Sequence, residues 1–146
     1  PAPAKAPRRL WPAAVAAGLF TVVAAAGLIA YGRIRGVPLW RPELAILLPL
    51  YPLYGVAQQL AVQGIFHRRL LLLTRSRPLA AVATALAFGM LHATNPALLA
   101  LTAAAGLGWA LLYQRHPNVW PLGVSHGILA ALAYPLALGE NPLTAV

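Results

Sequence analysis

The chain has 146 residues, with no cysteine, 60% hydrophobic residues and only 9% charged residues. Because ordinary soluble domains carry roughly a quarter charged residues, this composition excludes the soluble globular, disordered, collagen-like and disulfide-rich classes. The net charge is +9, from 11 Lys and Arg against 2 Asp and Glu, but the basic residues lie in the N-terminal segment or between uncharged stretches. That distribution is typical of membrane proteins, so we expect no nucleic-acid binding.

Long uncharged stretches dominate the sequence, and each can cross a bilayer as a helix, which requires about 20 apolar residues. The stretch from Pro78 to Gln114 is too long for one span, and Thr94-Asn95-Pro96 supplies a turn in its middle. We therefore predict an all-α integral membrane protein, a single domain with a bundle of about five transmembrane helices. The predicted helices are residues 10–32, 42–66, 78–95, 97–114 and 117–139.

The basic residues also predict an orientation. Residues 1–9 form a basic N-terminal segment and residues 140–146 a short tail. Counted on alternate sides of the five predicted helices, the Lys and Arg residues number eight against three, which favours a cytoplasmic N-terminus. We expect the protein to be integral to a bacterial inner membrane and, because it begins with Pro rather than Met, to have a preceding segment. Four tryptophans near the ends of the spans are predicted interfacial anchors: Trp11, Trp40, Trp109 and Trp120.

Polar side chains inside the predicted spans mark the candidate site, because they are costly at bilayer depth and usually face the bundle interior. They are Gln58, Gln59 and Gln63 on the second helix, Thr84, His92, Thr94 and Asn95 on the third, and Ser125 and His126 on the fifth. The glutamines alone are equally consistent with interhelical hydrogen bonding, at roughly 1 kcal/mol each. Gly123 and Gly127, four residues apart, permit close approach of a neighbouring helix that would hold His126 in place.

Two histidines on separate helices raise the prospect of a shared pocket. If His92 and His126 meet, they can bind a metal, stabilise an oxyanion or exchange a proton. Zinc sites in enzymes use three protein ligands plus water, and no nearby carboxylate completes such a set. We therefore expect no cofactor and no divalent metal.

In chain order, these motifs resemble those of the CAAX protease and bacteriocin-processing family, also called CPBP or Abi. Gln58-Gln59-Leu60-Ala61-Val62-Gln63-Gly64 lies where the family has Glu-Glu-x-x-x-Arg, usually followed by Gly. Phe88-Gly89-Met90-Leu91-His92 resembles its Phe-x-x-x-His motif, and His126 opens its His-x-x-x-Asn motif with Ala130 at the Asn position. The similarity covers about residues 44–135 and implies the CAAX-protease fold.

The resemblance also implies an intramembrane endopeptidase, in which the glutamates activate water while His and Asn bind that water or stabilise the oxyanion. By this correspondence, Gln58 and Gln59 match the paired glutamates, Gln63 the arginine, Phe88 and His92 the second motif, and His126 the last histidine. A glutamine amide cannot act as a general base. The leading hypothesis is therefore a catalytically inactive family member that serves as a binding or accessory subunit of a membrane complex.

Two alternatives stay open. One is a divergent intramembrane endopeptidase that uses His92 or His126 as its base, since a neutral imidazole can do this near pH 7. The other is a membrane subunit in which a histidine ligates haem or a pigment. In each case the expected partners are the lipid bilayer and other membrane proteins, with no specific small molecule predicted.

Overall fold

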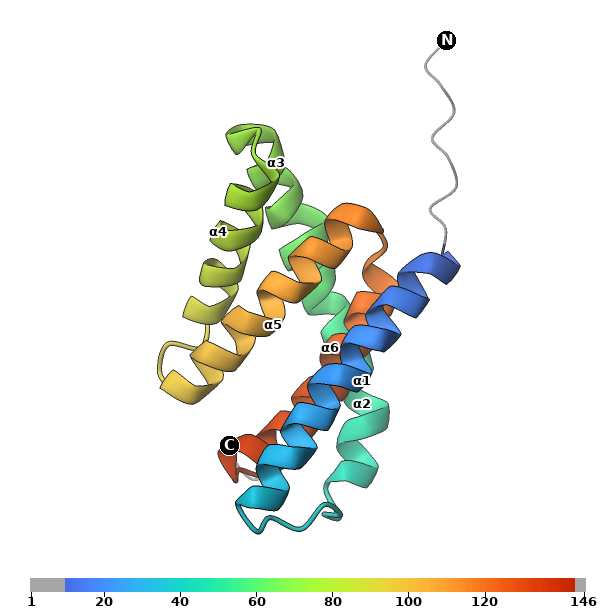
Figure 1. Cartoon of the computed structure of the whole chain (residues 1–146), viewed down its shortest axis with the longest axis vertical. Helices are drawn as coiled ribbons and strands as arrows, with labels where there is room; N and C mark the ends of the chain where they lie inside the picture. Colours follow the sequence, from blue (N-terminus) through green and yellow to red (C-terminus); the bar gives the residue numbers. More distant parts are fainter. Residues whose placement is uncertain (1–9, 144–146) are drawn as a thin grey trace.

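The protein is all-helical in a computed structural model that describes residues 10–143 (Figure 1). The predicted basic segment, residues 1–9, and the last three residues of the predicted tail lie outside the described residues. In chain order the elements are α1 (Leu10–Ile34), α2 (Leu44–Gln59), the π-helical η1 (Leu60–His67), α3 (Arg68–Thr74), α4 (Arg77–Met90), α5 (Pro96–Arg115), α6 (Val119–Ala133) and the π-helical η2 (Tyr134–Leu138). The predicted all-α class is confirmed.

Four helices of the described chain are long and apolar enough to cross a membrane: Leu10–Ile34, Leu44–Thr74, Pro96–Arg115 and Val119–Leu138. The second joins α2, η1 and α3 without a break, so it is longer than the predicted helix that ends at residue 66. The third predicted span is too long, because α4 has 14 residues. At about 1.5 Å per residue, α4 is shorter than the roughly 30 Å hydrocarbon core.

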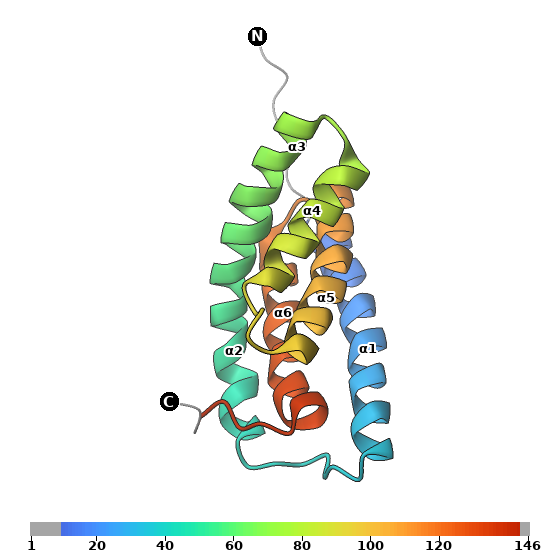
Figure 2. The same ribbon diagram turned by 90° about the vertical axis from the view of Figure 1, so that its left-hand side faces the viewer.

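The turn between α4 and α5 explains where α4 ends. The His92 amide donates to the Gly89 carbonyl at 2.9 Å, which starts a series of turns. Asn95 is extended, as the residue before a proline prefers, and its Oδ1 accepts from the Leu98 amide at 3.0 Å. The predicted hairpin is thus confirmed, and it stops part-way along the long axis, short of the end where α1 and α2 are joined (Figures 1 and 2).

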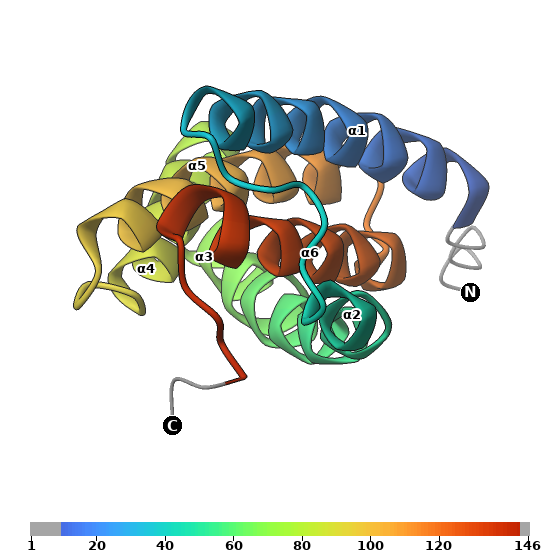
Figure 3. The same ribbon diagram turned by 90° about the horizontal axis from the view of Figure 1, so that it is seen from below.

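The close contact between α2 and α6 fixes the middle of the bundle. Seen from below, α6 lies between α1 and α2 (Figure 3). A Cβ added at Gly55 would fall on the Gly123 carbonyl oxygen, one at Gly123 on the Val56 backbone, and one at Gly127 on the Pro52 backbone. The predicted close approach at the α6 glycines is therefore confirmed.

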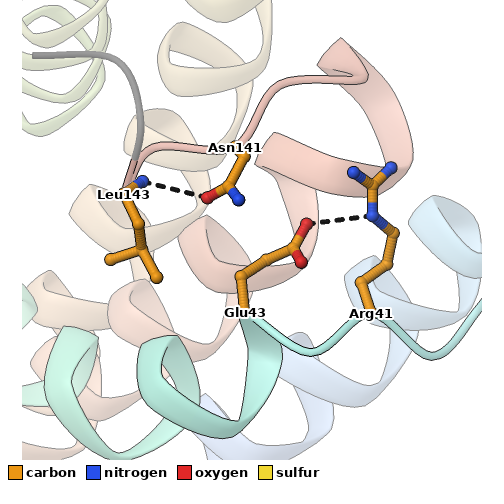
Figure 4. A network of polar contacts seen from close by, with 4 residues as sticks. All are labelled: Arg41, Glu43, Asn141 and Leu143. Atoms are coloured by element: carbon orange, nitrogen blue, oxygen red, sulfur yellow. Dashed lines mark hydrogen bonds and ion pairs between the residues drawn. The ribbon is translucent and has the colours of Figure 1, made fainter.

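Both acidic residues of the chain lie beyond the ends of helices and have partners. Glu43 precedes α2 and turns its carboxylate to Arg41, whose Nε lies 2.9 Å from Glu43 Oε1 (Figure 4). In the neighbouring C-terminal turn, the Leu143 amide donates to Asn141 Oδ1 at 3.0 Å. Glu140 follows η2, and its Oε1 accepts from Asn95 Nδ2 at 3.3 Å.

The glycine contact yields a stability prediction. Gly127→Ala places a methyl group against the Pro52 backbone, which cannot move aside as a flexible side chain can. We expect a loss of about 1–3 kcal/mol or more in the free energy of unfolding. The measurement is thermal unfolding of the purified protein in mild detergent.

Gly18→Ala is the matched control for that variant. Gly18 has no atom within 4 Å of an added Cβ and lies in the middle of α1. Because Ala favours helix over Gly, this variant should be as stable as the parent or slightly more so. Equal stability of the two variants would contradict the close packing of α2 against α6.

Candidate functional site

The site centres on His126, which α6 places inside the bundle with 6% of its surface exposed. Its Nδ1 lies 3.3 Å from Nε2 of Gln59, the last residue of α2. The imidazole stacks on the Trp109 ring, with centroids 4.6 Å apart and planes at 29°. The Phe88 ring meets it edge-on, with a centroid distance of 5.4 Å. Three helices thereby hold one histidine ring in place.

Trp109 is itself anchored by a chain of hydroxyl groups. Its Nε1 donates to Ser125 Oγ at 3.0 Å, and Thr21 Oγ1 lies 2.7 Å from both Ser125 Oγ and the Ala17 carbonyl oxygen. The chain ties α1, α5 and α6 together beside His126. The prediction of Trp109 as an interfacial anchor is wrong, because only 2% of its surface is exposed. Hydropathy gave no sign of this, since Trp suits both places.

His92 lies in the turn after α4, not within a helix. Its Nδ1 is 3.2 Å from the Phe88 carbonyl oxygen, and its ring packs on Phe88 with centroids 5.5 Å apart. Phe88 thus touches both His92 and His126. His92 and His126 line the same cavity.

The three candidate glutamines have different surroundings. Gln58 is half-buried and lines the cavity. Gln59 and Gln63 are fully buried, and Gln63 has no hydrogen-bond partner for its side chain among residues 10–143. Gln63 lies in η1, where the wider turn keeps residues four apart on one face of the helix. Single π-helical turns inside α-helices are frequent at functional sites.

A cavity of about 640 Å³ lies beside the two histidines. Its walls come from α1, α2, α5, α6 and η2 and are mostly apolar, with Ala24, Leu101, Ala105, Leu129 and Ala133 among them. Ala130, at the position of the family's asparagine, lines it as well. The size falls within the roughly 300–1,000 Å³ of small-molecule sites. The first helix, which lies outside the resemblance, therefore contributes one wall.

The donor set does not fit a metal centre. Within the described chain, no group of three or more His, Cys, Asp or Glu side chains could hold a metal ion. The cavity offers two imidazoles and no carboxylate, because neither Glu43 nor Glu140 is among the residues that line it. A catalytic zinc ion requires three protein ligands.

Comparison with known families assigns the chain to one of them. Residues 39–132 match the family described as Type II CAAX prenyl endopeptidase Rce1-like. The chain belongs to this family. The matched residues include all three motif regions, from Gln58 to His126, and agree with the range expected from the motifs. Neither the curated proteins nor the solved structures that we compared with the chain gave a match.

A second buried polar cluster, centred on His67, lies outside the positions that resemble the CAAX-protease motifs. His67 is fully buried at the end of η1; its Nδ1 lies 2.7 Å from Thr84 Oγ1 and its Nε2 lies 3.2 Å from Gln114 Nε2. Gln114 also donates to the Arg77 carbonyl at 2.8 Å. Sequence analysis missed His67 because the predicted span stopped at residue 66. The four-residue steps from Gln59 to Gln63 to His67 carried the signal.

The His67 cluster predicts a stability effect. His67→Ala leaves the Gln114 amide without one partner and opens a cavity between η1 and α4. We expect the free energy of unfolding to fall by about 2–4 kcal/mol, measured by thermal unfolding in detergent. His116→Ala is the control, because the hydrogen bonds of His116 in residues 10–143 come from its backbone. Equal losses of unfolding free energy in the two variants would show that the hydrogen bonds of His67 do not stabilise the bundle.

The hydrogen bonds that link Trp109, Ser125 and Thr21 predict a further effect on stability. Ser125→Ala removes the acceptor of the buried Trp109 indole N–H, which should cost about 1–3 kcal/mol of unfolding free energy. The control is Thr102→Ala, because the Thr102 hydroxyl donates to carbonyl groups of its own helix. Thermal unfolding of both variants tests this, and an unchanged Ser125→Ala protein would show that the chain of hydroxyls does not stabilise the bundle.

Proposed function

We propose that this CAAX-protease-family membrane protein binds rather than cleaves, and that it serves as an accessory subunit of a membrane complex. One observation carries the proposal: amides occupy the positions of the paired glutamates, and the Gln59 amide is hydrogen-bonded to His126. An amide neither takes up a proton from water at ordinary pH nor presents negative charge. The proposal treats the cavity as a binding site.

The acids of the chain support the same conclusion. Glu43 is paired with Arg41, and Glu140 accepts a hydrogen bond from Asn95. Glu43 lies about four helical turns from Gln58, and neither acid lines the cavity, whereas a general base must come within hydrogen-bond reach of its proton. Neither carboxylate takes the place of the glutamates that the resemblance would require.

The histidines give little support to the alternative of a divergent endopeptidase. The Nδ1 atoms of His92 and His126 contact a backbone carbonyl and an amide nitrogen, so no carboxylate orients either imidazole. Ala130 supplies no side-chain donor for an oxyanion, which usually depends on such donors for a large part of its stabilisation. The haem- or pigment-binding alternative stays a prediction, and none of the contacts described favours it.

The outer surface supports a partner in the membrane. Large apolar side chains are exposed on the outside of several helices, including Leu19 and Val23 on α1 and Leu72 and Leu73 on α3. In a bilayer these faces contact lipid or the helices of other membrane proteins. An accessory role uses the same surfaces that hold the bundle in the membrane.

The test combines cleavage and co-purification. The full chain, purified in mild detergent from the membranes in which it naturally occurs, should leave a farnesylated CAAX peptide intact under conditions in which an active family member cleaves it. Mass spectrometry of the same preparation should find a protein retained in stoichiometric amount. Cleavage that disappears in His126→Ala would overturn the proposal in favour of the divergent peptidase.

A further inference from the structure

The hydrogen-bond contacts of the two cavity histidines imply that their protons lie on different ring nitrogens. The first is His92, whose Nδ1 faces the Phe88 carbonyl oxygen at 3.2 Å. A carbonyl oxygen can only accept, so Nδ1 must carry the hydrogen. A neutral imidazole has one N–H group, which leaves His92 Nε2 with a lone pair. His92 therefore presents a hydrogen-bond acceptor.

His126 has the opposite arrangement of ring protons. Its Nδ1 faces Nε2 of Gln59 at 3.3 Å, and an amide nitrogen can only donate. Nδ1 must then be the unprotonated nitrogen, and Nε2 carries the hydrogen. A doubly protonated ring would set two N–H groups against each other at the Gln59 contact. His126 therefore presents a hydrogen-bond donor.

Neither Nε2 atom has a hydrogen-bond partner in the described part of the chain, although both residues line the same cavity. The remaining wall is mostly apolar, although Gln58, Thr102 and four tyrosines also line it, and it contains no carboxylate, ammonium or guanidinium group. A ligand that satisfies both nitrogens must donate to His92 and accept from His126. The rest of that ligand should be uncharged and largely apolar to match this wall.

We propose that the cavity binds a neutral apolar molecule whose polar end is a hydroxyl group, such as a long-chain alcohol or an uncharged lipid with a free hydroxyl. The hydroxyl oxygen accepts from His126 Nε2, the hydroxyl proton is donated to His92 Nε2, and the apolar chain lies against the alanine-rich walls. This inference rests on the proposed function, because it names a ligand for the same non-catalytic cavity.

Other ligand classes fit less well. An ammonium group has no acceptor for His126, and a carboxylate has no donor for His92 and would bring an unpaired charge into an apolar site. A metal ion binds imidazole lone pairs, and only His92 offers one. Water and a hydroxyl group both meet the two requirements, but only a hydroxyl on an apolar chain also fills the mostly apolar remainder of the cavity.

Gln59 decides which nitrogen of His126 is protonated, so Gln59→Glu reverses the arrangement. An ionised carboxylate can only accept, which places a hydrogen on His126 Nδ1 and, in the neutral ring, leaves lone pairs on both Nε2 atoms. The variant should lose the hydrogen bond from His126 to the ligand oxygen, while the acceptor at His92 remains. Gln63→Glu is the matched control: it adds the same carboxylate one turn further along the same continuous helix, where the described structure gives no hydrogen bond to His126.

The experiment uses the full chain in phosphatidylcholine nanodiscs, with 1-dodecanol and dodecyl methyl ether as probes that differ in the hydroxyl proton. Nitrogen-15 NMR of labelled histidine should show Nδ1–H on His92 and Nε2–H on His126. The parent and Gln63→Glu proteins should bind the alcohol about tenfold more tightly than the ether, the ratio for one unmatched buried polar group. For Gln59→Glu both probes lose the donor at His126, so each should bind about tenfold more weakly than to the parent, whereas Gln63→Glu should bind both as the parent does.

Each other result counts against the inference. A proton on His126 Nδ1 in the parent protein, equal binding of the alcohol and the ether, or no binding of the alcohol would overturn it. None of these results touches the accessory role, which the cleavage and co-purification test decides separately. Conversely, cleavage of the CAAX peptide by a protein that still prefers the alcohol would overturn the proposed function and leave the hydroxyl site standing.

Discussion

The backbone contact between α2 and α6 sets the positions of the other parts of the site. Gly55, Gly123 and Gly127 have no side chains, so the two helices approach until backbone meets backbone. Gln59 lies one turn beyond Gly55, and His126 lies between the two glycines of α6. The amide of Gln59 therefore reaches the imidazole at 3.3 Å. A wider separation would remove that hydrogen bond and leave two polar groups unpaired inside the bundle.

A neutral set of polar side chains occupies the helix face where the family motif calls for an ionic one. Gln59, Gln63 and His67 follow one another at four-residue steps and are all fully buried. Removing charges from water costs much more than removing amides, because an amide gives up hydrogen bonds but no ionic solvation. By the correspondence that the resemblance implies, this face is buried and polar without the ion pair that the motif would supply. The amide of Gln59 also determines, in our proposal, which nitrogen of His126 is a donor toward the cavity.

Hydropathy and turn chemistry were enough to predict the helical class, the membrane and the α4–α5 hairpin, because long apolar runs and Asn-Pro have few other structural meanings. The motif order predicted the family. Hydropathy could not show that α4 ends at Met90, since Leu91 is as apolar in a turn as in a helix. Nor could it separate buried Trp109 from an interfacial tryptophan, or reveal which ring nitrogen of His126 carries the proton. Those depend on contacts between residues far apart in the chain.

The shortness of α4 has a consequence for the surrounding lipid. The α4–α5 turn ends part-way along the bundle, and its backbone amides at His92, Ala93 and Asn95 are hydrogen-bonded within the turn. A hydrophobic helix shorter than the hydrocarbon core is accommodated by local thinning of the bilayer, by flanking side chains that reach the interface or by contact with other helices. Local thinning costs less in a thin membrane than in a thick one. The length of α4 would therefore bias the protein toward thinner membranes.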